Sequence, residues 1–334
     1  MKTVMGIDGG GTQTRAVIFN DKGLLLGIGV AESSNPNVVG QKQSISALKI
    51  AMTAACDSAE IKLNSMDSVF LGISGLPRVN REVFKKTLTD KLSFTTSQSF
   101  AIDHDLHIAL TGGLVGEPGI VLVVGTGSAC YGLKKDGSRS QSGGWGYLVD
   151  DFGSAYWIGL QALAAVAQSA DQRAKPTALT HVIKEALELG EINQLISRIY
   201  DPSFSRDEIA SLAPHVFFTA TSGDTTALAI IHRGCEELAR MTTTVARKLH
   251  WNNAPLKIVI TGGVARAKKQ FLNPLNAALK NNLPQATLIK PILPPVFGAV
   301  LLAYKLINIS PSESLIKELK DQAANNMVDF ADKV

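Results

Sequence analysis

The sequence predicts an α/β protein of two lobes built on one repeated plan. At 334 residues the chain is longer than a single hydrophobic core usually covers. A strand, a glycine-rich turn and two more strands open the chain, and the same order recurs around residue 125. Helical periodicities alternate with short apolar strands elsewhere, which is typical of α/β lobes. We therefore place the first lobe at residues 1–115, with a final helix at 312–326 as a candidate addition, and the second lobe at 116–308.

The first repeat begins with a buried strand at residues 3–7 and a turn of three glycines. An alternating strand at 13–19, a hairpin turn at 20–23 and a third strand at 24–30 complete a meander. Helices are predicted over 41–59 and 80–91, and strands over 68–73 and 100–102.

The second repeat has the same elements in the same order. A strand at 120–124 leads into the turn Gly125-Thr126-Gly127-Ser128, and strands follow at 129–133 and from 138. Later elements are helices at 154–169, 225–249 and 297–307, and a strand at 257–261. The helix at 225–249 carries an apolar stripe spaced three to four residues apart, which indicates one buried face.

Composition excludes several functional classes. The net charge of +4 comes from scattered basic residues, so nothing indicates a nucleic-acid partner. No leader or apolar segment long enough to span a bilayer is predicted, so we expect no membrane partner. The three cysteines lie far apart without metal-binding spacing, which favours a reducing compartment and a cytoplasmic location. The oligomeric state stays open, with a homodimer as the candidate assembly.

The two glycine turns predict a site for a polyphosphate. Glycine lets backbone N–H groups approach an anion, and in Gly9-Gly10-Gly11-Thr12 the threonine adds a hydroxyl donor. Asp8, at the end of the preceding strand, can hold Mg²⁺ directly or through water. The second turn, with Gly125, Thr126 and Gly127, has the same chemistry without the carboxylate.

Two nucleotide-binding alternatives fail on context. A Rossmann loop needs G-x-G-x-x-G opening a helix, whereas a strand follows Gly11, and no G-x-x-x-x-G-K-[ST] loop occurs. The plainer alternative, that both segments are simple hairpin turns, remains open from the residues alone.

These segments resemble a known superfamily. Asp8-Gly-Gly-Gly-Thr-Gln-Thr, Gly125-Thr-Gly-Ser and Thr261-Gly-Gly-Val are similar to the two phosphate motifs and the adenosine motif of the actin, Hsc70 and sugar-kinase superfamily. Gly143-Gly-Trp-Gly and the segment from Asp151 to Gly159 resemble eukaryotic-type N-acetylglucosamine kinases and their BadF/BadG relatives. The resemblance implies the duplicated, ribonuclease H-like fold of actin-like ATPases, with ATP and Mg²⁺ as cofactors and Gly262 and Gly263 beside adenosine. Nucleotide and sugar are expected to meet in a cleft.

A kinase of this kind needs a carboxylate to receive the proton of the attacking hydroxyl. His104-Asp105-x-x-x-Ala-Leu resembles the family's Asn-Asp-Ala-x-x-Ala-Leu, which makes Asp105 the predicted base and Asp103 the alternative. A helix N-cap is the structural alternative for either residue. His104 stands where the family has asparagine, a departure that bears on substrate preference.

The resemblance also assigns sugar-binding residues. They are Asn35, Ser74, Gly144, Trp145 and Asp151. Core packing for Trp145 and a helix cap for Asp151 remain alternatives. Ala129 stands where a relative that binds the N-acetyl group has asparagine, so glucosamine or another sugar remains open.

The predicted function is ATP-dependent phosphorylation of an amino sugar, N-acetylglucosamine or glucosamine, at the 6-hydroxyl. Two rival functions remain. One is a BadF-type ATPase activator that couples hydrolysis to electron transfer through an iron–sulfur cluster. The other is a sugar-sensing protein without turnover.

Overall fold

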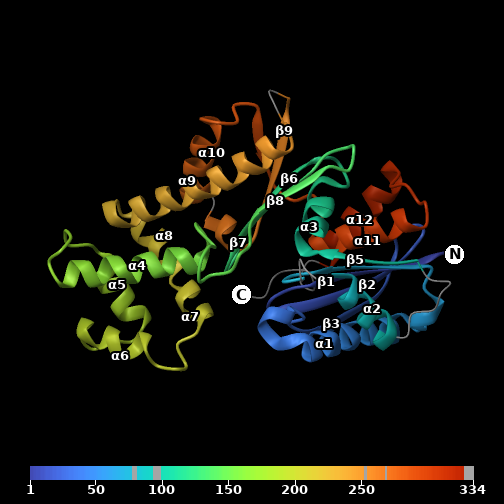
Figure 1. Ribbon diagram of the computed structural model, residues 1–334, viewed down its shortest axis with the longest axis horizontal. Helices are drawn as coiled ribbons and strands as arrows, with labels where there is room; N and C mark the ends of the chain where they lie inside the picture. Colours follow the sequence, from blue (N-terminus) through green and yellow to red (C-terminus); the bar gives the residue numbers. More distant parts are fainter. Residues whose placement is uncertain (77–80, 93–98, 252–253, 268, 327–334) are drawn as a thin grey trace. The chain divides into compact units, whose positions relative to one another are not determined.

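The computed structural model describes residues 1–76, 81–92, 99–251, 254–267 and 269–326. The chain forms two compact units (Figure 1). Met1–Pro118 and the chain from Lys290 onward make the first unit, and Gly119–Ile289 makes the second.

The first unit contains a five-stranded mixed sheet in the order β3-β2-β1-β4-β5. Its strands are β1 (Thr3–Gly9), β2 (Gln13–Asn20), β3 (Leu25–Glu32), β4 (Ser68–Ile73) and β5 (Ser99–His104). The first three strands pair antiparallel, as the predicted meander requires, and β4 and β5 run parallel to β1. Its helices are α1 (Pro36–Ala59), α2 (Arg81–Leu92), α3 (Asp105–Leu114), α11 (Pro295–Leu306) and α12 (Glu313–Asn325), with a 3₁₀ turn at Leu63–Ser65. Residue 80, where the second helix was predicted to begin, lies outside the described residues.

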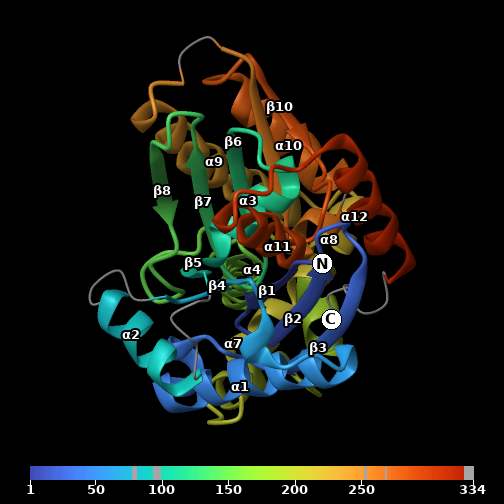
Figure 2. The same cartoon turned by 90° about the vertical axis from the view of Figure 1, so that its right-hand side faces the viewer.

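Alternate residues of these strands face two different cores. Met5, Ile7 and Ile18 pack on α1, whereas Val4 and Val17 pack on α11. Figure 2 shows α1 on one side of this sheet and α11 and α3 on the other. Both faces are covered, which explains why β1 reads as a nearly continuous apolar run.

The second unit repeats this plan. Its sheet has the order β10-β9-β6-β7-β8, so the meander β6 to β8 corresponds to β1 to β3, and β9 and β10 correspond to β4 and β5. The strands are β6 (Gly119–Val124), β7 (Ser128–Leu133), β8 (Arg139–Gly143), β9 (Leu256–Thr261) and β10 (Ala286–Ile289). The predicted duplication is therefore confirmed by the topology.

The helices of the second unit follow β8 and β9 along the chain. They are α4 (Ala155–Ala170), α5 (Leu179–Ala186), α6 (Leu195–Ile199), α7 (Arg206–Ser211), α8 (Ala213–Thr221), α9 (Thr225–Lys248) and α10 (Lys269–Lys280), with 3₁₀ turns at Ile192–Gln194 and Gly263–Ala267. The Asp224 carboxylate caps α9 by accepting from the N–H groups of Thr226 and Ala227. The predicted stripe of α9, including Cys235, Leu238 and Val245, is buried in the core.

Residues 290–308 belong to a different unit from the one predicted from the sequence. These residues were predicted to belong to the second lobe, whereas α11 belongs to the first unit. It packs on β1 and α3 so closely that a Cβ on Gly298 would lie 1.9 Å from the Ile108 carbonyl oxygen. The final helix α12 packs in the same core through Leu315 and Leu319.

Candidate active site

The first glycine turn lies at the carboxyl end of β1. In the parallel register Gly9, Ile73 and His104 are neighbours, so β1, β4 and β5 end at one edge of the sheet. The segments that follow these strands carry the first turn, Ser74 and Asp105. Adjacent strands lie about 4.8 Å apart, so this edge brings the three predicted elements within about 10 Å. Such a strand edge is the usual place for ligands in α/β proteins.

Backbone hydrogen bonds join the first turn to the predicted sugar-binding segments. The N–H of Ser74 donates to the carbonyl of Gly9 at 2.8 Å, and that of Ser34 donates to the carbonyl of Gly10 at 3.3 Å. Asn35 caps α1 by accepting from the Asn37 N–H, and its amide nitrogen lies near Gly11. A shift of the turn would therefore move these segments as well.

Two buried hydroxyls in this cluster have no hydrogen-bond partner within the described part of the chain. They are Ser34 Oγ and Ser74 Oγ. Ser74 was predicted from the sequence, whereas Ser34 was missed although it precedes Asn35. Because unpaired buried hydroxyls are costly, both are candidates for contacting a ligand.

Asp105 is the first residue of α3. His104 holds the N-cap position without a side-chain capping bond, so the N-cap alternative for Asp105 does not apply. The Asp105 side chain is half-buried, and its Oδ1 accepts from the Leu106 N–H at 3.0 Å. Burial raises the pKa of this carboxyl to about 6, with the Leu106 N–H opposing the change. A carboxylate with a raised pKa at a strand edge suits a general base.

Asp103 is in a different environment. Its Oδ2 contacts Nδ1 of His107 at 2.9 Å, and its Oδ1 accepts from the His104 N–H at 2.8 Å. Burial alone would raise the pKa of Asp103, but the His107 hydrogen bond and the neighbouring imidazoles hold that pKa well below its usual range. Asp103 therefore joins the end of β5 to the first turn of α3 and is a poor proton acceptor.

Asp103→Asn should lower the free energy of unfolding by about 1.5–3 kcal/mol at pH 7, because it removes a charged hydrogen bond from a buried pair. A carboxyl with a lowered folded-state pKa stabilises the fold above its unfolded pKa of about 3.9, and this contribution is lost as pH falls through the folded pKa. Urea unfolding at pH 7 and in acid measures both effects, with the exposed Asp171→Asn as the matched control. Equal stabilities of Asp103→Asn and the parent chain at pH 7 would contradict this role.

The second glycine turn contacts a predicted sugar-binding residue. Oδ1 of Asp151 accepts from the Ser128 N–H at 3.0 Å, and Oδ2 accepts from Nη2 of Arg206, also at 3.0 Å. A Cβ on Gly127 would lie 2.8 Å from both carboxylate oxygens. Ser154, not Asp151, provides the capping oxygen of α4. Arg206 was missed because no motif surrounds it and it lies far from Asp151 in sequence.

Gly144 and Trp145 lie in the loop after β8. The Gly144 N–H donates to the Ser128 carbonyl at 3.2 Å, which ties this loop to the second turn. Trp145 is 69% exposed, so core packing is excluded for its side chain. The structure thus places Gly144, Trp145 and Asp151 beside the second turn.

The predicted adenosine turn lies next to the second glycine turn. Val123 of β6 pairs with Thr261 of β9, which sets Gly262 against the backbone of Gly125. Gly262 has φ +105°, and a Cβ there would lie 2.4 Å from the Val124 carbonyl oxygen. A Cβ on Gly125 or Gly263 would meet no atom of the described residues within 4 Å. These two glycines therefore border open space at the carboxyl ends of neighbouring strands.

The cysteines bear on the electron-transfer alternative. Cys130 and Cys235 are buried, and burial raises the pKa of each thiol to about 12. Buried, protonated thiols differ from the thiolates that bind iron–sulfur clusters. No cluster of three metal-ligating side chains occurs among the described residues.

In the part of the chain that the structure describes, none of the helices has the length and apolar character needed to span a membrane.

Two units with one sheet order, each with a glycine turn after its first strand, define a duplicated actin-like ATPase fold. The chain belongs to the BadF/BadG/BcrA/BcrD ATPase family, whose model matches residues 5–303. The family predicted from the motifs is thereby confirmed.

Named relatives cover nearly all of the chain. It is 32% identical over 311 residues to an N-acetyl-D-glucosamine kinase of Dictyostelium discoideum, covering 90% of this chain and 97% of the relative. It is 30% identical over 304 residues to an N-acetylmuramic acid/N-acetylglucosamine kinase of Clostridium acetobutylicum, covering 91% and 98%. A crystal structure described as a candidate N-acetylglucosamine kinase of Chromobacterium violaceum has a TM-score of 0.73 at 25% identity, covering 91% and 99%.

Proposed function

We propose that this protein transfers the γ-phosphoryl group of ATP to an amino sugar, N-acetylglucosamine or glucosamine, at its 6-hydroxyl. The observation that carries this proposal is Asp105, a carboxylate with a raised pKa at the strand edge that also holds the first glycine turn. Relatives named as amino-sugar kinases support the substrate class.

The two turns bind phosphate groups of ATP in this proposal. In the first turn, Gly9, Gly10, Gly11 and Thr12, the N–H of Gly10 already donates to the Gln13 carbonyl at 3.0 Å, so those of Gly11 and Thr12 would bind phosphate. In the second turn, Gly125, Thr126 and Gly127, the N–H of Gly125 donates to the Gly127 carbonyl at 2.9 Å, so those of Thr126 and Gly127 would bind phosphate. Gly262 and Gly263 border the adenosine. The open space beside Gly125 and Gly263 supports these roles, since a Cβ at either position would have no atom of the described chain within 4 Å.

Asp8 is the proposed Mg²⁺ ligand. It is half-buried at the end of β1, directly before the first turn. Mg²⁺ keeps several waters and takes one or two carboxylates together with substrate phosphates, so a single aspartate beside a phosphate turn fits this ion. When bound, the ion would neutralise charge on the phosphates.

Asp105 receives the proton of the sugar hydroxyl as phosphoryl transfer proceeds. The proposed sugar-binding residues are Asn35, Ser74, Gly144, Trp145 and Asp151. A few fixed polar groups of this kind orient a small substrate. We place the reaction in the cytoplasm, where ATP is available.

A coupled ADP-release assay over N-acetylglucosamine, glucosamine, N-acetylmannosamine, N-acetylmuramic acid and glucose tests the proposal. We expect MgATP-dependent turnover with an amino sugar, and phosphorus–proton coupling in NMR spectra of the product should locate the phosphate on carbon 6. Sugar binding without ADP release would favour the sensing alternative. ATP hydrolysis indifferent to sugars, together with iron in anaerobically purified protein, would favour the activator.

A further inference from the structure

Arg206 contacts Asp151, a residue beside the second glycine turn, from a part of the chain to which no role has been assigned. It is the first residue of α7, and its guanidinium reaches Oδ2 of Asp151 at 3.0 Å. Its Nε is buried and has no hydrogen-bond partner among the described residues. The guanidinium carbon also lies 5.1 Å from the centre of the Tyr147 ring. One cation thus contacts two residues of the loop over 143–153, which carries Gly144 and Trp145.

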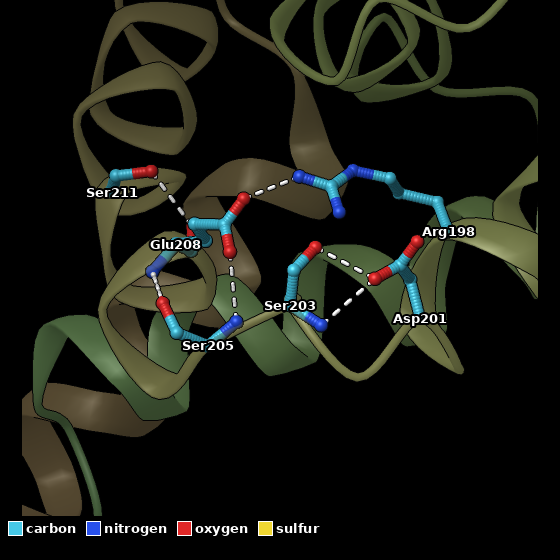
Figure 3. Close-up of polar contacts among 6 residues, drawn as sticks. All are labelled: Arg198, Asp201, Ser203, Ser205, Glu208 and Ser211. Carbon is cyan, nitrogen blue, oxygen red and sulfur yellow. Dashed lines mark hydrogen bonds and ion pairs between the residues drawn. The ribbon is translucent and has the colours of Figure 1, made fainter.

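A polar network fixes the helix end that carries Arg206 (Figure 3). Ser205 and Glu208 form a reciprocal capping box at the start of α7. Glu208 also pairs with Arg198, and Asp201 closes the preceding turn by accepting from the N–H and the hydroxyl of Ser203. A short helix held in this way keeps its first residue in place, and that residue is Arg206.

The other oxygen of the Asp151 carboxylate, Oδ1, binds the second glycine turn. Oδ1 accepts from the Ser128 N–H, while the Asp151 backbone is in the left-handed region at φ +60°. The left-handed conformation is unfavourable for a residue other than glycine, so such a residue keeps it only where the surrounding structure holds it there. Arg206 and Ser128 are the two partners that fix this side chain.

Among the described residues, the charged and titratable groups around Asp151 are Arg206, Asp150, Tyr147 and Tyr156. Burial raises the pKa of Asp151, and Asp150 raises it further, whereas the Ser128 N–H and Arg206 lower it. Among these groups Arg206 is the cation, so its removal leaves the buried carboxylate without a compensating charge.

We propose that Arg206 is a positioning residue for sugar recognition, holding Asp151 and the 143–153 loop in the arrangement that binds the sugar. This inference rests on the proposed kinase function, and it adds a residue that contacts the site through Asp151 rather than through substrate. Arg206→Lys keeps the charge but loses the planar fork and the stacking on Tyr147.

The test compares Arg206→Met and Arg206→Lys with Arg173→Met, which removes an arginine paired at the exposed surface of the same unit. Carbon-13 NMR follows the titration of the Asp151 carboxyl, assigned with Asp151→Asn. We expect Arg206→Met to move the titration midpoint upward by about one pH unit or more. Arg206→Lys should keep the midpoint near that of the parent chain, and Arg173→Met should not move it.

Sugar binding is measured in parallel, as KM in the kinase assay and as Kd by calorimetry. Arg206→Met should weaken sugar binding about 10–100-fold, the range for loss of a charged hydrogen bond. The sugar affinity of Arg206→Lys should lie between that of Arg206→Met and that of the parent chain. If Arg206→Met does not fold, the same measurements are made on Arg206→Gln.

An unchanged Asp151 midpoint in folded Arg206→Met, or unchanged sugar affinity, would overturn the inference. A parent chain that phosphorylates no sugar would instead overturn the proposed function. The carboxyl titration and the calorimetry do not depend on turnover, so they would still decide the role of Arg206.

Discussion

Asp105→Asn should reduce kcat about 10²–10⁴-fold while leaving the folded protein at least as stable as the parent chain. The loss follows because asparagine cannot accept the hydroxyl proton. Binding of ATP should persist, since the phosphate turns are unchanged. Steady-state kinetics, nucleotide affinity and urea unfolding of the same preparation separate the three effects.

The stability prediction comes from the direction of the pKa shift. Burial raises the pKa of Asp105 to about 6, so its stabilising contribution is present below the unfolded pKa and is lost as pH rises through 6. The ionised side chain therefore costs stability at pH 7, and asparagine should recover about 1–2 kcal/mol after allowance for partial exposure and the helix N-terminus. The kcat of the parent chain should also fall as pH drops below about 6. Near-normal turnover of Asp105→Asn would remove Asp105 from the proposed role.

Gly127→Ala should disable the second turn, whereas Gly125→Ala two residues away should leave the fold intact. An alanine Cβ at 127 would lie 2.8 Å from both Asp151 oxygens and 2.9 Å from Nη2 of Arg206. Crowding of this kind costs about 1–3 kcal/mol, so the melting temperature should fall by several degrees and turnover should be lost.

Gly125→Ala is the matched control because, within the part of the chain that the structure describes, no atom lies within 4 Å of its added Cβ. We expect it to melt like the parent chain and to bind ATP more weakly, since the methyl group would occupy proposed ligand space. Differential scanning calorimetry and the KM for ATP distinguish the two variants. Equal melting temperatures for Gly127→Ala and the parent chain, with normal turnover, would contradict the arrangement described for Asp151.

Local sequence patterns were sufficient to predict most of the framework. The strand at 68–73 was predicted with its observed bounds, and the helix at 225–249 ends one residue earlier in the structure. Both carry strong periodicity or clear capping residues, which are local properties. The repeated meander was visible for the same reason, because each copy is continuous in sequence.

What depends on contacts between distant segments was not visible in the sequence. Residues 290–308 follow the second repeat, and nothing in their composition indicates that α11 packs on β1. Arg206 reaches Asp151 from a run of short helices without a motif. The motif resemblance favoured Asp105 over Asp103 as the base, but the contact between Asp103 and His107, four residues along the chain, is visible only in the coordinates.

The order in which the units appear along the chain has a consequence for biosynthesis. Every residue of the second unit leaves the ribosome before α11, although the first sheet is made at the start. The apolar side chains of Val4, Val17 and Phe70 must then wait for that helix before they are covered. A nascent chain that has reached residue 289 should hold a finished second unit and a first sheet whose α11 face is only partly covered, by Ile108 of α3, the stage at which chaperone capture or aggregation is most favoured.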